Sequence, residues 1–593
     1  MRAASLFGVL VLAKLMVLAG IGQPVGGWGA IAYFWQDMAV ALLAGAVDAA
    51  LRQPRLGWLF YGVLVIYIAW GVPVAIVLGT PLTWPLIGAA RGPLAGSIAH
   101  YFTVINVVRI AAVVAAGIIL PAVCSRIGRA NVPASSRPVT WSALAAAVLF
   151  VAAGPMAVSH VETMGLERNA VTALLPSRFP GGAVARADAD WRLSPFGDAS
   201  VASGAPAGTR ESLLRLHGAA RGRNVLVVVL ESTAAQYLRA YGAAEDPTPN
   251  LTALSRQAIV FDNAYATYPE SIKGLFSVLC SRFPAFGIGA EEHARMPCAS
   301  LANEFARGGY ATGLFHSGRF GYLGMDAILE RKGFNVLEDA GAIGGNVQSS
   351  FGVDESATVQ RVLTWIDDQP RHAPFFAMYL PVAGHHPYAT TVPGPFPDGT
   401  EYDRYRNALH EGDAALGALL DGLRARGISD QTAIVIFGDH GEAFGQHRGN
   451  VGHTLFINEE NVKVPFLIAI PGLTTTPVRS AEIVSLIDVA PTLLDVAGLR
   501  PPGGYQGASA LAAAHRMALF MTDYSLGLLG LRDGCWKYIY DMDAGRSKLF
   551  DVCADPGETS DRSAEERARV RMYRERVLGW SAAQRAQVTG GAR

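Results

Sequence analysis

Long apolar runs alternate with short polar segments over the first 158 residues. The runs cover residues 6–21, 29–51, 56–78, 102–123 and 139–158. Each is about long enough to cross a ~30 Å hydrocarbon layer as a helix. The first run could instead be a cleaved signal peptide, but Lys14 interrupts it and four further runs follow, which favours a retained helix. The pattern therefore predicts a helical transmembrane domain of about five spans at residues 1–158.

Arginines in the loops between these runs predict their orientation. Only Arg91 lies in the loops on one side, and six arginines lie on the other: Arg2, Arg52, Arg55, Arg126, Arg129 and Arg137. The positive-inside rule assigns the side with six to the cytoplasm. Because five crossings are an odd number, everything after about residue 158 is expected outside the cytoplasm.

Besides Lys14, three charged residues fall inside the apolar runs: Asp37, Asp48 and Arg109. An isolated charge in the middle of a membrane costs at least about 2.5 kcal/mol. We therefore expect these residues to face a partner or a polar cavity, with an ion pair between Asp37 and Arg109 as one arrangement. Hydration near the membrane interface is the alternative.

The pattern changes after residue 158. Residues 159–223 are rich in Ala, Gly, Pro and Arg and predict a linker with one short helix near 162–175. Apolar runs of strand length then alternate with amphipathic stretches such as 413–424; the runs are Asn224–Leu230, Phe375–Leu380, 433–437 and 465–470. Continuous apolar runs are typical of parallel strands buried on both faces. Residues 224–593 are therefore expected to form an α/β domain with a central, mostly parallel sheet.

Charge is distributed unevenly, although the whole chain has 49 basic and 49 acidic residues. Residues 1–158 contain nine Lys or Arg and two Asp or Glu, whereas the other 435 residues contain 40 basic and 47 acidic side chains. An acidic soluble part argues against a protein that binds nucleic acid through a basic domain. A hydrophobic content of 51% argues against disorder.

Four of the five cysteines lie in the part expected outside the cytoplasm, where disulfides form. Four cysteines allow three pairings, and we favour the two local ones, Cys280 with Cys298 and Cys535 with Cys553. The fifth, Cys124, lies at the cytoplasmic end of the fourth run.

Candidate chemistry gathers where predicted strands end. Glu231 follows the first strand, and Asp439 and His440 follow the strand at 433–437. Functional groups of open α/β sheets lie at the carboxyl ends of the strands. Two carboxylates and an imidazole suit a divalent cation, and a cation beside the Ser271 hydroxyl would favour its alkoxide. Taken singly, each residue could equally be a turn or helix cap.

Several ordered motifs resemble the sulfatase and alkaline phosphatase superfamily from Asn224 to about Asp561. They include NVLVVVLES, FDNAYATYPES, GYATGLFHSGRFG, PFFAMYLPVAGHHPY and IVIFGDHGEAFGQH. Five spans followed by such a domain resemble the membrane-anchored branch of this superfamily. That branch includes lipoteichoic acid synthases, phosphoglycerol transferases and phosphoethanolamine transferases.

The resemblance implies a role for each matching residue. The metal ligands would be Glu231, Ser271, Asp439 and His440, with Ser271 also the nucleophile; the metal would be Mn²⁺, Zn²⁺ or Mg²⁺. His316, His385 and His453 match positions that contact the transferred phosphate or sulfate. Lys273 is expected either to contact the substrate anion or to be a solvated side chain.

Departures from the family pattern separate its branches. In place of the signature that sulfatases convert to formylglycine, the nucleophile position reads SIKGL, with Lys273 for the expected Pro and Leu275 for the expected Arg. Glu231 is followed by Ser232, so one of the paired aspartates of sulfatases is missing. Cys280 lies nine residues too late to be the nucleophile. The ending WKYIYDMDAGRSKLFDVCADPGE, in contrast, is more typical of sulfatases.

The resemblance implies a metal-dependent transferase in a bacterial inner membrane, with its catalytic domain in the periplasm. It would move a phosphoryl-alcohol head group from a membrane phospholipid to an envelope glycan or lipid acceptor, through a covalent Ser271 intermediate. One alternative is a membrane-anchored sulfatase or phosphodiesterase. Another is a lipid sensor that has kept the fold without the activity.

Overall fold

A computed structural model of the chain describes residues 1–593 apart from 52, 79–80, 85–86, 88–101, 131–136, 164, 176–189, 198–208, 322–323, 350–351, 371–372, 475, 513–515 and 591–593. Arg52 and Arg91, and much of the predicted linker, lie outside the described residues. The chain divides into two compact units, one made chiefly of residues up to 178 and one chiefly of residues from 179.

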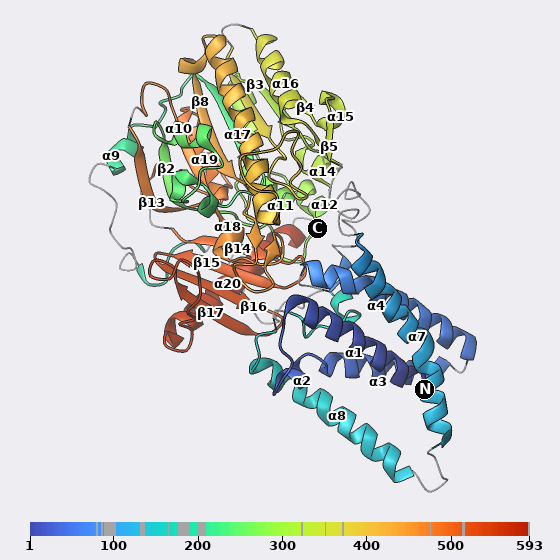
Figure 1. Cartoon of the computed structure of the whole chain (residues 1–593). Helices are drawn as coiled ribbons and strands as arrows, with labels where there is room; N and C mark the ends of the chain where they lie inside the picture. The colour runs from blue at the N-terminus through green and yellow to red at the C-terminus, as the bar shows by residue number, and fades with distance from the viewer. Residues whose placement is uncertain are drawn as a thin grey trace. The chain divides into compact units, whose positions relative to one another are not determined.

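The first unit is helical, and its described part contains five segments long and apolar enough to cross a membrane (Figure 1). The helices are α1 (Arg2–Ile21), α2 (Gly29–Ala32), α3 (Trp35–Leu51), α4 (Pro54–Leu78), α7 (Val104–Ala130) and α8 (Arg137–Ser159). The second predicted span comprises α2 and α3, which are separated by a turn at Tyr33 and Phe34. The prediction of about five apolar helices is confirmed.

The charge on Asp37 is paired inside this unit, but the predicted pairing with Arg109 is wrong. Lys14 Nζ lies 3.2 Å from Asp37 Oδ2, and the Asn169 side-chain amide donates to Oδ1. Arg109 instead donates to the Asn106 side chain, one helical turn earlier, at 2.8 Å. Lys14 reaches Asp37 because it lies on the neighbouring helix α1, which packs against α3.

The second unit contains a nine-stranded sheet in the order β11-β2-β12-β8-β1-β7-β3-β4, with β13 beside β2. The strands are β1 (Asn224–Leu230), β2 (Ile259–Tyr265), β3 (Ala311–His316), β4 (Val336–Glu338), β7 (Phe375–Leu380), β8 (Thr432–Gly438), β11 (Lys463–Val464), β12 (Phe466–Ala469) and β13 (Val478–Ser485). β8, β1, β7, β3 and β4 run parallel, whereas β12 and β11 are antiparallel to their neighbours. The predicted mostly parallel sheet is confirmed.

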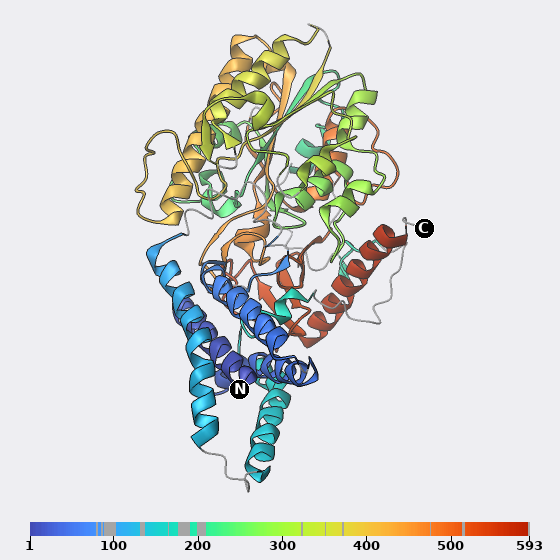
Figure 2. The same cartoon turned by 90° about the vertical axis from the view of Figure 1, so that its right-hand side faces the viewer.

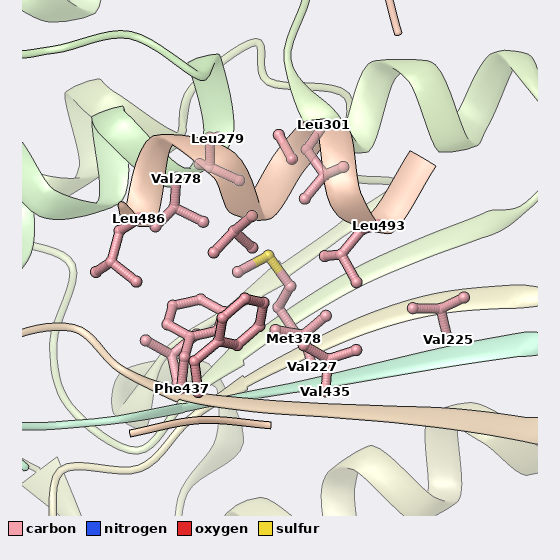
Figure 3. Close-up of a cluster of buried hydrophobic side chains, with 14 of the residues drawn as sticks. Val225, Val227, Val278, Leu279, Leu301, Met378, Val435, Phe437, Leu486 and Leu493 are labelled. Carbon is pink, nitrogen blue, oxygen red and sulfur yellow. The ribbon is translucent and has the colours of Figure 1, made fainter. Parts of the chain in front are cut away.

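The central strand β1 is apolar throughout because both of its faces are covered. Val225 and Val227 join a core on one face of the sheet, and Leu226 and Val228 join a second core on the other. Figure 3 shows Val225 and Val227 on the same side of the sheet as Val278 and Leu279 of helix α11 (Ser271–Cys280), together with Val435 and Phe437 of the neighbouring strand β8. This alternation with a period of two is what a strand between two helical layers requires.

Helices cover both faces of the sheet, as Figure 2 shows. Residues of α11, α13 (Leu301–Arg307) and α19 (Val489–Val496) pack into the core that contains Val225. Residues of α10 (Pro249–Ser255), α16 (Glu355–Asp367) and α17 (Glu401–Ala425) pack into the core that contains Leu226. The predicted amphipathic stretch 413–424 lies within α17.

A smaller antiparallel sheet follows, which the apolar pattern did not predict. It consists of β14 (Ala518–Thr522), β15 (Leu528–Asp533), β16 (Trp536–Asp541) and β17 (Arg546–Asp551), and packs against α20 (Arg567–Gly590). Cys535 is bonded to Cys553 at this sheet, and Cys280 to Cys298 at the end of α11. Both favoured disulfides are therefore confirmed.

Candidate active site

The parallel pairing of β1 with β8 brings the candidate metal ligands together. Leu230 is aligned with Gly438 at the ends of these strands, so the next residues, Glu231 and Asp439, leave the sheet side by side. The Ser232 backbone N–H donates to Asp439 Oδ1 at 3.0 Å. Glu231, Asp439 and His440 are all buried, with one ligand atom of each within 4.8 Å of the others.

Ser271 reaches this cluster from the first residue of α11. Glu270 caps the helix, because its carboxylate accepts from the backbone N–H groups of Ile272 and Lys273. Ser271 Oγ lies 3.0 Å from Glu231 Oε2, 2.7 Å from Asp439 Oδ2 and 3.2 Å from His440 Nε2; these are the four residues that the family resemblance selects. The structure thus assembles them around one hydroxyl.

The cluster has more acceptors than donors, which suits a cation. Ser271 has one hydroxyl proton, yet its oxygen faces two carboxylates and an imidazole nitrogen. His440 Nδ1 lies 3.0 Å from the Gly441 carbonyl, which can only accept, so Nδ1 carries a proton and Nε2 is the ring nitrogen that faces the cluster. Oxygen and nitrogen donors of this kind fit Mn²⁺, Zn²⁺ or Mg²⁺.

Electrostatics support the same interpretation. Burial raises the pKa of Asp439, and the nearby Glu231 carboxylate raises it further. Burial opposes ionisation of Glu231, but its pKa is lowered because His440, His385 and His453 stabilise the anion when they are protonated and Ser232 Oγ donates a hydrogen bond to it. Two buried carboxylates this close hold a proton between them unless positive charge is added. A divalent cation would supply that charge.

Three further histidines surround this cluster. His316 ends β3 and lines the same cavity as Ser271, together with Glu231 and Asp439. The His453 ring lies 4.4 Å from the His440 ring and 5.9 Å from the His385 ring, measured between centroids. The structure therefore brings all three predicted histidines to one site.

Their hydrogen bonds divide these histidines into two kinds. His316 Nδ1 donates to the carbonyl of Leu380 at 2.9 Å, and His385 Nδ1 to that of the next residue at 2.7 Å. Burial lowers the pKa of both rings, so each is neutral with a lone pair on Nε2. Burial also opposes a charge on His453, but the Glu442 carboxylate, 2.6 Å from its Nδ1, raises the pKa of His453 to about 9.

Lys273 is paired within the protein rather than solvated. Its Nζ lies 2.8 Å from Asp523 Oδ1 and 4.5 Å from the centroid of the Tyr268 ring, and its side chain is 12% exposed. This ion pair joins α11 to the residue after β14. Lys273 is thus a half-buried, paired cation rather than a solvated side chain.

Sequence reasoning missed two buried carboxylates near the histidines. Glu442 follows His440 by two residues, and Tyr388 donates to its second oxygen at 2.8 Å. The only signal in the sequence for a role of Glu442 was its position in the DHGE motif, two residues after His440. Glu355, at the start of α16, had none, because its partners lie far from it in the chain.

Glu355 connects the ends of β3 and β7, near His316 and His385, through hydrogen bonds. Its carboxylate accepts from Ser317 Oγ at 2.9 Å, the Tyr379 hydroxyl at 2.5 Å and the Val382 N–H at 2.7 Å. Burial raises its pKa from 4.5 to about 7.

Glu355→Gln is expected to flatten the pH dependence of stability. Between about pH 4.5 and 7 the folded protein keeps the Glu355 proton whereas the unfolded chain loses it, so this residue makes stability fall as pH rises through that window. Melting temperatures of the full chain in detergent at pH 5, 6, 7 and 8 measure the effect. Glu330→Gln, at an exposed carboxylate, should follow the wild type; equal pH slopes in wild type and Glu355→Gln would contradict the prediction.

Comparisons with known proteins agree with this geometry. Residues 223–499 match the Sulfatase family model. The chain is 24% identical over 320 residues to lipoteichoic acid synthase-like YvgJ of Bacillus subtilis (strain 168), a match that covers 50% of this chain and 51% of that protein. It is 29% identical over 219 residues to arylsulfatase K of Bos taurus, covering 33% of this chain and 40% of that one. The chain therefore spans about half the length, or less, of these curated relatives.

A solved structure shows the same fold. The phosphonate monoester hydrolase of Agrobacterium radiobacter superposes with a TM-score of 0.50 and 20% identity, covering 62% of this chain and 96% of that one.

Proposed function

Because residues 223–499 form a Sulfatase-family domain, we propose that this chain transfers a phosphoryl-alcohol head group from a membrane phospholipid to an envelope acceptor. The observation that carries the proposal is the position of Ser271 Oγ within 3.2 Å of Glu231, Asp439 and His440. A hydroxyl so placed is suited to act as a nucleophile. The match to a lipoteichoic acid synthase-like protein supports a phospholipid donor.

Glu231, Asp439, His440 and Ser271 would hold a divalent cation. When bound, such a cation lowers the pKa of the serine hydroxyl and neutralises charge on the phosphoryl oxygens. His440 is oriented for this role by the hydrogen bond from its Nδ1 to the Gly441 carbonyl.

The first half-reaction forms a bond from Ser271 Oγ to phosphorus and breaks the bond from phosphorus to the diacylglycerol oxygen. The Ser271 proton leaves along the 2.7 Å hydrogen bond to Asp439. His453, positively charged beside Glu442, faces the non-bridging oxygens. In the second half-reaction an acceptor hydroxyl attacks the same phosphorus, the bond from phosphorus to Ser271 Oγ breaks, and Oγ takes back its proton from Asp439.

His316 and His385 are suited to move the other protons. Each is neutral before substrate binds, and the arriving phosphate anion would raise its pKa. An imidazolium at either position would protonate the departing diacylglycerol oxygen, and the resulting imidazole would then take the proton of the acceptor hydroxyl. Such acid–base assistance contributes about 10²–10⁴-fold to rate.

Gly318→Ala is expected to lower kcat/KM about 100-fold while the fold is retained. A Cβ at Gly318 would lie 2.3 Å from His316 Nε2, so the ring must move away from the position where it transfers a proton. Turnover of a chromogenic phosphodiester measures the effect. Gly321→Ala is the matched control, because a Cβ there meets no atom within 4 Å. Wild-type activity in Gly318→Ala would show that His316 takes no part in the reaction.

A hydrolase is the second candidate, favoured by the match to arylsulfatase K. In that case water takes the place of the acceptor hydroxyl. Phospholipid labelled in its head group distinguishes the two reactions when diacylglycerol and head group are followed together with an added glycan or lipid acceptor. Diacylglycerol with a labelled acceptor supports transfer, whereas release of free head group alone supports hydrolysis.

The proposed setting is a bacterial inner membrane, with the Sulfatase-family domain in the periplasm. The five apolar helices support a membrane location, and the two disulfides fit an oxidising compartment. A membrane anchor suits a phospholipid donor, because such a lipid does not diffuse far through water.

A further inference from the structure

The last residues of β14 hold the chain that leads into Ser271. The backbone N–H of Met521 donates to the carbonyl of Thr267 at 3.0 Å, which attaches the residues before α11 to the smaller antiparallel sheet. Asp523, the first residue after β14, reaches α11 through Lys273, which lies in the first turn of that helix. The smaller sheet contains none of the predicted site residues, yet its end contacts the chain on both sides of the nucleophile.

The Asp523 carboxylate accepts hydrogen bonds from three donors. Its Oδ1 accepts from the Lys273 ammonium at 2.8 Å and from the Tyr268 hydroxyl at 2.7 Å, and its Oδ2 accepts from the Gly287 backbone N–H at 2.6 Å. Only 8% of the Asp523 side chain is exposed. Burial opposes its charge, but Lys273 and these hydrogen bonds lower its pKa, so the carboxylate is ionised and its contact with Lys273 is a true ion pair.

Two of these donors flank Ser271 in the sequence. Tyr268 precedes the nucleophile by three residues and Lys273 follows it by two. The Lys273 ammonium also lies 4.5 Å from the centroid of the Tyr268 ring, so the two side chains contact each other as well as Asp523. The first turn of a helix lacks part of the backbone hydrogen bonding of its interior and frays most readily. Asp523 therefore restrains the turn that carries the Ser271 hydroxyl.

The same strand end also holds the loop that carries His453. The hydroxyl of Thr522, the last residue of β14, donates to the carbonyl of Thr454, the residue after His453. The backbone N–H of Thr454 donates in turn to the carbonyl of Pro269 at 2.8 Å, two residues before Ser271. The position of His453 relative to the nucleophile therefore depends on contacts made at the end of β14.

The ion pair gives a physical reason for one departure from the sulfatase pattern. Lys273 stands in SIKGL where that pattern has proline. A proline restrains the chain by fixing its own backbone torsion φ. Lys273 leaves that torsion free, and its side chain is held instead by Asp523, so the first turn of α11 is restrained from another part of the fold.

We propose that Asp523 is a positioning residue for the nucleophile: through Lys273 and Tyr268 it keeps Ser271 Oγ at the three candidate metal ligands. Asp523 acts through its neighbours and does not touch the substrate. The inference rests on the proposed role of Ser271 as nucleophile, and it applies equally to transfer and to hydrolysis because both begin with attack by the same hydroxyl.

Asp523→Asn is expected to lower kcat about 100-fold, with KM within about twofold of the wild type and the bound metal retained. The amide has one acceptor oxygen where the carboxylate has two, so at least one of the three donors loses its partner and the first turn of α11 shifts. Turnover of a chromogenic phosphodiester by the full chain in mild detergent measures the kinetic constants, and elemental analysis measures the metal.

Asp533→Asn is the matched control, because it also removes a buried carboxylate from the smaller sheet. Asp533 ends β15, is fully buried and accepts from the Tyr573 hydroxyl at 2.7 Å. It lies about 17 Å along β15 from Leu528, the residue aligned with Thr522. Asp533→Asn should lower the melting temperature and leave kcat at the wild-type value.

Lys273→Met tests the ion pair while leaving the hydrogen bonds from Tyr268 and Gly287 to Asp523 in place. It is expected to lower kcat about tenfold, and it decides the question if Asp523→Asn does not fold. In the double variant the two losses should not multiply, because the two residues act on Ser271 as one pair. Wild-type kcat in either single variant, or losses that multiply in the double variant, would overturn the proposal.

Hydrogen exchange of the backbone amides in residues 267–273 gives a readout that needs no turnover. Exchange should be faster in Asp523→Asn than in the wild type and unchanged in Asp533→Asn. Equal exchange in Asp523→Asn and the wild type would overturn the proposal. If the wild type turned over no phosphodiester, the proposed function would fail, but faster exchange in Asp523→Asn alone would still support a restraint on this segment by Asp523.

Discussion

Ser271→Ala is expected to abolish head-group transfer, with a loss of at least about 10⁴-fold in kcat. The variant removes Ser271 Oγ, which lies within 3.2 Å of Glu231, Asp439 and His440. Among the described hydroxyl groups of the site, it is the only one so placed that it could attack phosphorus. Losses of this size are typical when a covalent nucleophile is removed, because the remaining groups have no intermediate to stabilise. Release of diacylglycerol from labelled phospholipid measures the effect.

Ser277→Ala is the matched control for this experiment. Ser277 lies on the same helix, but its hydroxyl accepts from Thr267 Oγ1 at 2.8 Å rather than facing the metal ligands. Wild-type turnover in Ser271→Ala, with the protein folded, would show that another group attacks the substrate. Cys280 is not such a group, since its sulfur is bonded to Cys298.

Asp439→Asn is expected to remove a tightly bound divalent cation and to lower activity at least about 1,000-fold. The amide has no charge, and its nitrogen cannot serve as a ligand beside Glu231 and His440. Elemental analysis of purified protein measures the metal, and phospholipid turnover measures the activity. Chelation of the wild type should give the same loss, and addition of Mn²⁺, Zn²⁺ or Mg²⁺ in turn should identify the ion that restores it.

Asp430→Asn controls for the loss of a carboxylate, because Asp430 is exposed and precedes β8 rather than following it. It should retain both metal and activity. If Asp439→Asn held as much metal as the wild type, or if chelation left turnover unchanged, a metal-dependent reaction at this cluster would be excluded.

Apolar runs predicted the helices and the central strands well because burial on all sides leaves a simple pattern. Asn224–Leu230 and Phe375–Leu380 form β1 and β7 with the predicted bounds. The run at 465–470 also forms a strand, β12, but its antiparallel direction depends on the connection from β11, which apolar content does not report. β15 and β16 were not predicted, because short antiparallel strands of mixed polarity lack a continuous apolar run.

The candidate ligands were predictable because they follow directly on strands whose parallel pairing aligns their ends. Pairing between side chains that lie far apart in the sequence was not predictable. Arg109 was one arrangement considered for Asp37, which instead meets Lys14, and Lys273 meets Asp523, 250 residues away. Such partners depend on how helices and sheets pack in three dimensions, and no local spacing encodes that arrangement.

The central claim is that Ser271 carries the transferred group. Mass spectrometry of the peptide containing Ser271, isolated from the full chain after exposure to phospholipid without acceptor, tests this claim most directly. A phosphoryl-alcohol adduct on Ser271 that disappears when acceptor is added is the predicted result. Formylglycine at this position, or an adduct on a different residue, would contradict it.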